Sequence, residues 1–110
     1  MAVEQYRTYI QQLLKQHGKY KAAYGEVEAQ TIFDTQNDHY QLVHVGWNGS
    51  HRVYGCVLHL DIKDGKIWIQ QDGTEVGIAN ELIELGVPKE DIVLGFHSPF
   101  MRKFTDFAVN

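Results

Sequence analysis

Two dipeptides that favour tight turns, Asn48-Gly49 and Asp64-Gly65, divide the middle of this 110-residue chain. Asn-Gly and Asp-Gly readily adopt the positive φ angles of two-residue hairpin loops. The segments around them alternate in hydropathy and are rich in β-branched and aromatic residues. We expect strands at 29–34, 40–47, 52–62 and 67–70. Because the connections between them are short, the pattern predicts a four-stranded antiparallel meander.

Helical patterns lie on both sides of this region. Apolar residues at three- and four-residue spacing predict an amphipathic helix over residues 3–17, followed by a connector at 19–25. After the strands, Asp72 and Glu75 have the spacing of a capping box, and the apolar residues that follow predict a helix ending before Gly86. Among those apolar residues, Val76 is expected on the buried side.

Two proline signals predict further helical turns near the C-terminus. Pro88 suits the first position of a short helix, and Ser98-Pro99 combines a capping residue with a first-position proline. The expected fold class is therefore α+β: an N-terminal helix, a four-stranded antiparallel meander sheet, then a C-terminal helix and short helical turns. The length fits one domain over residues 1–110.

Composition places the chain in a reducing compartment. A single cysteine, Cys56, cannot form an intrachain disulfide, and the start of the chain lacks the apolar run of a signal peptide. No segment approaches the roughly 20 apolar residues that a membrane span needs. We therefore expect a cytoplasmic protein that does not contact a membrane.

The second face of the expected sheet is unusually apolar. If helices cover one face, the other would carry several large side chains, namely Val43, Val45, Trp47, Val57 and Trp68. A contiguous apolar patch of this kind marks an interaction site. We expect a second copy of the chain or another partner to cover this face.

Charge is unevenly distributed. The chain carries a formal net charge of −4, yet residues 1–25 hold four basic residues, Lys21 included, against one acidic residue, a net of +3. Nucleic-acid binding depends mainly on Lys and Arg. An acidic body disfavours non-specific duplex binding, and the basic first helix is also what a solvated helix surface would show.

The sequence offers residues for four kinds of chemical site, and each has a structural alternative. Six histidines are present, but no local HxH or HExxH spacing indicates zinc, although His44 and His59 fall on neighbouring strands. Cys56 alternates with Leu58 and Leu60, which indicates an inert core thiol.

Paired carboxylates near Asp72 and Glu75 have turn and cap roles that suffice to explain them. The run from Gly73 to Gly77 lacks the lysine of a phosphate-binding loop. We expect no catalytic residue, no resident metal and no cofactor.

The C-terminal tail is the strongest candidate surface. It runs from Gly95 to Lys103 and is punctuated by glycine and proline. Loops with aromatic and arginine side chains often form interaction surfaces; the alternative is a capped turn that packs its aromatics on the sheet. The candidate interaction surface comprises Phe96, His97, Ser98, Phe100, Arg102 and Lys103 in the tail, with Trp47 and Trp68 on the sheet.

The chain resembles the XisI family, the cyanobacterial fdxN-element excision controlling factors. The resemblance rests on Lys66-Ile67-Trp68-Ile69-Gln70, Asp72-Gly73-Thr74-Glu75, Gly77-Ile78-Ala79, Leu85-Gly86-Val87-Pro88, Asp91-Ile92-Val93-Leu94-Gly95-Phe96 and Ser98-Pro99. Within these strings the motif residues Asp72, Gly73, Thr74, Glu75, Gly77, Gly86, Pro88, Gly95 and Pro99 are expected to be structural.

The resemblance implies a part in DNA recombination of the heterocyst type, the programmed excision of a DNA element. It implies partners as well: a site-specific recombinase complex and XisH, a companion protein that looks nuclease-like. Three hypotheses follow. The first is a non-enzymatic accessory factor that binds XisH, the second is an excisionase-type factor that binds DNA directly, and the third is a small metal-dependent enzyme using Asp72, Glu75 and His97.

Overall fold

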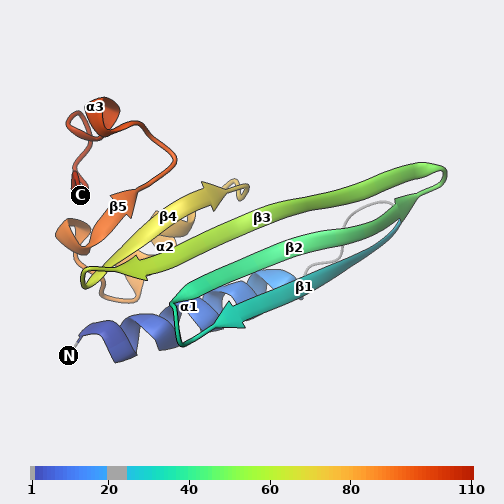
Figure 1. Ribbon diagram of the computed structural model, residues 1–110, viewed down its shortest axis with the longest axis horizontal. Coiled ribbons are helices and arrows are strands. Elements are labelled where there is room, and N and C mark those ends of the chain that lie inside the picture. The colour runs from blue at the N-terminus through green and yellow to red at the C-terminus, as the bar shows by residue number, and fades with distance from the viewer. Residues whose placement is uncertain (1, 20–24) are drawn as a thin grey trace.

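A computed structural model describes residues 2–19 and 25–110 of the chain. It contains a five-stranded sheet with helices along and after it (Figure 1). The elements are α1 (Ala2–Gly18), β1 (Glu26–Asp34), β2 (His39–Asn48), β3 (His51–Lys63), β4 (Lys66–Asp72), α2 (Ile78–Glu84), the 3₁₀ turn η1 (Lys89–Asp91), β5 (Ile92–Leu94) and α3 (Pro99–Arg102). The α+β class is confirmed, whereas most of the expected connector and Lys21 lie outside the described residues.

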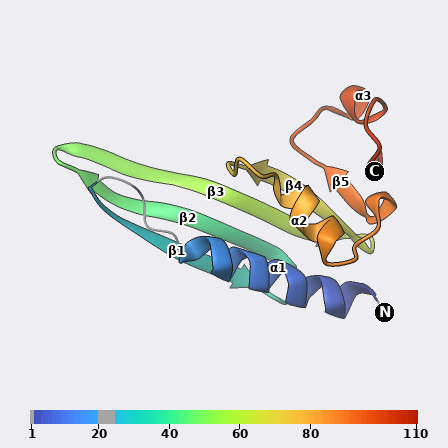
Figure 2. The same cartoon turned by 180° about the vertical axis from the view of Figure 1, so that it is seen from behind.

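Helices α1 and α2 cover the same face of the sheet (Figure 2). From α1, Ile10 and Leu14 are fully buried, and from α2, Ile78 and Leu82 are. They pack on one strand face, whose fully or nearly fully buried residues are Tyr40, Leu42, Leu58, Leu60, Ile67 and Ile69. We call this the inner face and the opposite one the outer face.

Polar contacts fix α1 against the rest of the molecule. Arg7 donates from Nε to Asp38 Oδ1 at 2.7 Å and from Nη2 to Asp38 Oδ2 at 3.0 Å, which joins the helix to the β1–β2 turn. The Arg7 guanidinium holds the pKa of Asp38 below its ordinary value. Near the other end, His17 Nε2 lies 2.7 Å from Glu81 Oε2 in α2.

A fifth strand corrects the expected four-stranded meander. The order is β1-β2-β3-β4-β5, and β5 pairs with β4 in parallel. A parallel pair needs a long crossover, which α2 and η1 provide. The strand escapes sequence analysis because it has three residues, all buried, and a short apolar run carries no alternation.

A bulge at Val57 changes which side chains of β3 face the core, so the facing expected from the sequence is wrong in part. In the hairpin, Val43 lies opposite Cys56, but the next position, Leu42, lies opposite Leu58, so Val57 is the extra residue. A bulge of this kind reverses which side chains face the core. The expectation that Cys56 shares a face with Leu58 is therefore wrong, and the thiol is exposed.

The start of α2 also differs from the capping-box expectation. The helix begins at Ile78 after Gly77, so Glu75 precedes it and Val76 is 64% exposed rather than buried. Asp72 instead closes the loop between β4 and the helix: its Oδ1 accepts from the Thr74 N–H at 2.9 Å, and its Oδ2 accepts from the Ile78 N–H at 2.9 Å. Asp72 therefore still caps the start of α2, but it does so from six residues before Ile78.

Candidate functional site

The C-terminal tail folds as the Ser98-Pro99 signal indicates. Ser98 Oγ accepts from the Met101 N–H at 3.3 Å, and Pro99 opens the single turn of α3. The chain then returns to the sheet, where the Ala108 N–H donates to the Ile92 carbonyl at 2.9 Å. The tail is thus joined to β5 both where it leaves and where it returns.

Arg102 anchors the middle of the tail to the outer face. Its guanidinium carbon lies 5.1 Å from the ring centroid of Trp68, which points outward from β4 between two core isoleucines. Arg102 Nε also donates to the His97 carbonyl at 3.1 Å, and Nη1 donates to the Val109 carbonyl at 3.4 Å. One side chain therefore ties together both arms of the tail and the sheet.

This anchoring leaves apolar side chains facing solvent. Of the nine exposed large apolar residues in the described part of the chain, five lie between residues 96 and 109. We define the tail surface as Phe96 (48% exposed), Phe100 (62%), Met101 (48%) and Phe104 (71%). The rings of Phe100 and Phe104 meet edge to face, with their centroids 5.4 Å apart. Lys103 Nζ lies 5.6 Å from the Phe100 ring centroid.

The remaining residues of the apolar second face behave differently from one another. Val43 is buried, Val57 packs against the core, and Val45 is partly buried. Trp47 stays half exposed near the tip of the β2–β3 hairpin, but Arg52 lies over its ring at 5.3 Å. The outer face is therefore not one continuous apolar surface.

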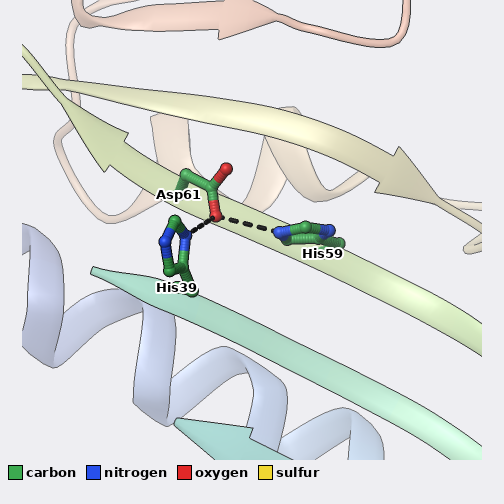
Figure 3. A group of neighbouring side chains, drawn as sticks. All are labelled: His39, His59 and Asp61. Carbon is green, nitrogen blue, oxygen red and sulfur yellow. Dashed lines mark hydrogen bonds and ion pairs between the residues drawn. The ribbon is translucent and has the colours of Figure 1, made fainter. Parts of the chain in front are cut away.

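The outer face instead carries a polar group of three side chains from β2 and β3 (Figure 3). We call His39, His59 and Asp61 the histidine cluster. Asp61 Oδ1 lies 2.8 Å from His39 Nδ1 and 2.9 Å from His59 Nε2. Asp61 Oδ2 accepts from Gln70 Nε2 at 3.2 Å, and Gln41 Nε2 lies 3.4 Å from His59 Nδ1.

The bulge at Val57 creates this cluster. Beyond the bulge, His39 lies directly opposite Asp61, and His59 is two residues from Asp61 on the same face. Without the extra residue, His39 would lie opposite Leu60, whose side chain is in the core. His44 and His59 do fall on neighbouring strands, as expected, but they do not face each other, because His44 lies opposite Gly55 and on the other face of the sheet.

The histidine cluster and a nearby carboxylate line a shallow hollow in the surface. The hollow has a volume of about 390 Å³ and is lined by the cluster together with Ile32, Asp34 and Gln41. The hydrogen bond to Asp61, and then its charge, raises the pKa of His39 above its ordinary value. Hydrogen bonds from Asn37 lower the pKa of Asp34, which keeps that carboxylate charged at the rim.

The other residues singled out from sequence have visible local roles. Thr74 Oγ1 donates to Asp72 and accepts from the Gly77 N–H, Gly86 follows α2 with φ +107°, and Pro88 immediately precedes η1. At Gly95 a Cβ atom would stand 2.7 Å from Gln70 Oε1. Within the described residues, the donor group that could hold a metal ion comprises His39, His59 and Asp61, not Asp72, Glu75 and His97.

Comparisons with known proteins agree on one family. A family model described as XisI protein matches residues 1–109. A crystal structure of a XisI-like protein from Anabaena variabilis ATCC 29413 is 46% identical, with a TM-score of 0.90, covering 96% of this chain and 97% of that one.

A second structure, the fdxN element excision controlling factor XisI from Anabaena variabilis ATCC 29413, is 37% identical with a TM-score of 0.86, and the match covers both chains fully. Comparison with curated proteins gives no match. Within the described residues, no helix has the length and apolar character needed to cross a membrane.

Proposed function

The chain belongs to the XisI protein family, and on that basis we propose that it is an accessory factor that controls excision of a DNA element. A solved relative carries the description of an fdxN element excision controlling factor over the whole length of the match. Excision control is a role in site-specific recombination. A protein can perform this role by contact with another protein, without catalysing a reaction itself.

The factor acts by binding a nuclease-like protein of the XisH kind through the tail surface. The observation that carries this proposal is the anchored tail. Arg102 holds the segment against Trp68, while Phe100 and Phe104 stay largely exposed. A preorganised aromatic cluster loses little conformational entropy on binding, and aromatic residues, phenylalanine included, are enriched at the core of protein interfaces.

We assign partner binding to the tail surface rather than to the outer face of the sheet. Near the hairpin tip, Arg52 already covers Trp47, and at the other end Arg102 covers Trp68. Self-association through the second face stays a prediction, which sedimentation velocity of the purified chain would test. A recombinase complex is the expected larger assembly in which the pair acts.

Direct DNA binding is the weaker alternative, because two of the arginines that could contact phosphates already bond to other groups of the same chain. Arg7 is paired with Glu4 and Asp38, and Arg102 anchors the tail. Charges used in this way release fewer counterions from DNA. Retention on duplexes carrying the element's ends, if it persisted at moderate salt, would favour this alternative.

The enzyme alternative has a similar difficulty. Asp72 is occupied by the loop and helix hydrogen bonds described above, and Glu75 is exposed before the helix. We therefore propose that the family role does not use these residues for catalysis. A nuclease assay with and without magnesium on the purified chain would contradict this if cleavage were lost on replacing Asp72 with Asn.

Co-expression with XisH tests the proposal directly. The two chains should elute together from a sizing column. The double variant Phe100→Ser with Phe104→Ser should elute apart from XisH, because both exposed rings are removed without touching the core. Val76→Ser is the matched control, since Val76 is 64% exposed but lies far along the chain from the tail. Separate elution of the unmodified chains would contradict the partner, and a complex that survives the double substitution would contradict the surface.

A further inference from the structure

We propose that His39, His59 and Asp61 form a binding site for a divalent transition metal ion of the zinc class. The site lies on the outer sheet face and is separate in sequence from the tail surface. Two imidazoles and one carboxylate are the donor set that such ions favour. In the described part of the chain, this is the group whose donor atoms all lie within 4.8 Å of one another.

Two of the three separations between donor atoms are close to those of a metal-bound site, and the two imidazole nitrogens lie within 4.8 Å of each other. Asp61 Oδ1 lies 2.8 Å from His39 Nδ1 and 2.9 Å from His59 Nε2. Tetrahedral zinc with bonds of 2.0–2.2 Å holds its donor atoms about 3.3 Å apart. Each imidazole therefore needs to withdraw from the carboxylate by only about half an ångström. The His39 side chain is 56% exposed and has the freedom to do so.

The framework of the site is rigid. His39 and Asp61 are directly paired across β2 and β3, and His59 lies two residues before Asp61 on the same strand face. Neighbouring side chains orient the donors: Gln70 donates to the free oxygen of Asp61, and Gln41 contacts the far nitrogen of His59. Such outer contacts direct the ligands in known metal sites. For His59 Nε2 to bind the ion, Nδ1 must carry the ring proton, which requires the Gln41 amide to turn its oxygen toward that nitrogen.

The surroundings favour a cation with open coordination positions. The hollow beside the cluster leaves space for water or for a further ligand, and the Asp34 carboxylate lines it. Three protein ligands with additional open positions are typical of sites that exchange ligands, whereas structural zinc sites have four protein ligands. We therefore expect moderate affinity and an accessible ion.

Zinc titration of the purified full chain tests this site. Calorimetry should be done in a Cys56→Ser background, because the exposed thiol is a competing zinc ligand. We expect one zinc ion per chain, with perturbed ring signals of His39 and His59 in NMR spectra. His39→Gln and Asp61→Asn should each weaken binding at least about tenfold.

His51→Gln is the matched control, because His51 is an exposed histidine near the tip of the same hairpin. Its zinc affinity should equal that of the background. His39→Gln removes a largely exposed side chain, so it should remain folded even if Asp61→Asn does not. Absence of zinc binding, or equal affinity in the His39→Gln and His51→Gln chains, would overturn the proposal.

Discussion

Arg102 of α3 lies over the indole of Trp68 in β4, with its guanidinium carbon 5.1 Å from the ring centroid. The contact joins the last helical turn of the chain to the outer face of β4, the strand next to the edge strand β5. The same guanidinium also bonds the carbonyls of His97 and Val109, and these contacts together hold the tail against the sheet.

Replacement of Arg102 with Met should release the tail. The change keeps the apolar stem but removes the cation–π contact and two hydrogen bonds, at a cost of about 1–2 kcal/mol in the free energy of unfolding. Hydrogen exchange should accelerate at the Arg102 and Phe104 amides more than in β2. Lys103→Met is the control, because Lys103 contacts the Phe100 ring and, within residues 2–19 and 25–110, donates to no carbonyl of the tail. Equal exchange in the two variants would contradict an anchoring role for Arg102.

Replacement of Asp72 with Ala should destabilise the start of α2. It leaves the Thr74 and Ile78 N–H groups without their acceptor, which costs about 1–2 kcal/mol for a lost cap. Glu75→Ala should change stability by less than about 0.5 kcal/mol, because Glu75 is exposed and outside the helix. Urea denaturation measures both changes. A larger cost for Glu75→Ala than for Asp72→Ala would restore the capping box expected from sequence.

Replacement of Gly46 with Ala should disturb the β1–β2 pairing. A Cβ atom there would stand 2.1 Å from the Glu26 carbonyl oxygen and 2.7 Å from Val27 Cα, and backbone atoms cannot move aside cheaply. We expect a loss of about 2 kcal/mol in thermal or urea unfolding. Gly55→Ala on the neighbouring strand is the matched control, because no heavy atom of the described residues lies within 4 Å of its added Cβ. Equal stability of the two variants would show that β1 does not pair as described.

The pairing of His39 with Asp61 should make stability depend on pH. A raised folded-state pKa means that the contribution is complete below the unfolded pKa of about 6.5 and is lost as pH rises through the folded value. The stability lost on His39→Gln should therefore be larger at pH 5.5 than at pH 8. In NMR titrations, Asp61→Asn should lower the pKa of His39 toward its ordinary value. An unchanged pKa would refute the pairing.

Much of the fold follows from local signals in the sequence. Asp64 and Gly65 both have positive φ, as a two-residue hairpin turn requires, and Ser98 caps α3 as expected. The tail surface could be proposed for the same reason, because its punctuation is local. Strand β5 could not be predicted, since its pairing depends on how the crossover through α2 packs.

The histidine cluster could not be predicted from the sequence, because it depends on one extra residue in β3 that shifts the strand register. In the hairpin register set by the turn at Gly49 and Ser50, where Asn48 pairs with His51, His39 would lie opposite a core leucine. The bulge at Val57 shifts the register by one and places His39 beside Asp61. The bulge places Leu58 and Leu60 in the core, which is a matter of tertiary packing rather than of turn-forming residues.

Hydrogen exchange of the complex with XisH tests the central claim most directly. Amides across residues 96–104 should exchange more slowly in the complex than in the free chain, while those near the tip of the β2–β3 hairpin stay unchanged. This result would place the partner on the tail surface. Protection confined to the hairpin, with the tail exchanging as in the free chain, would contradict the account.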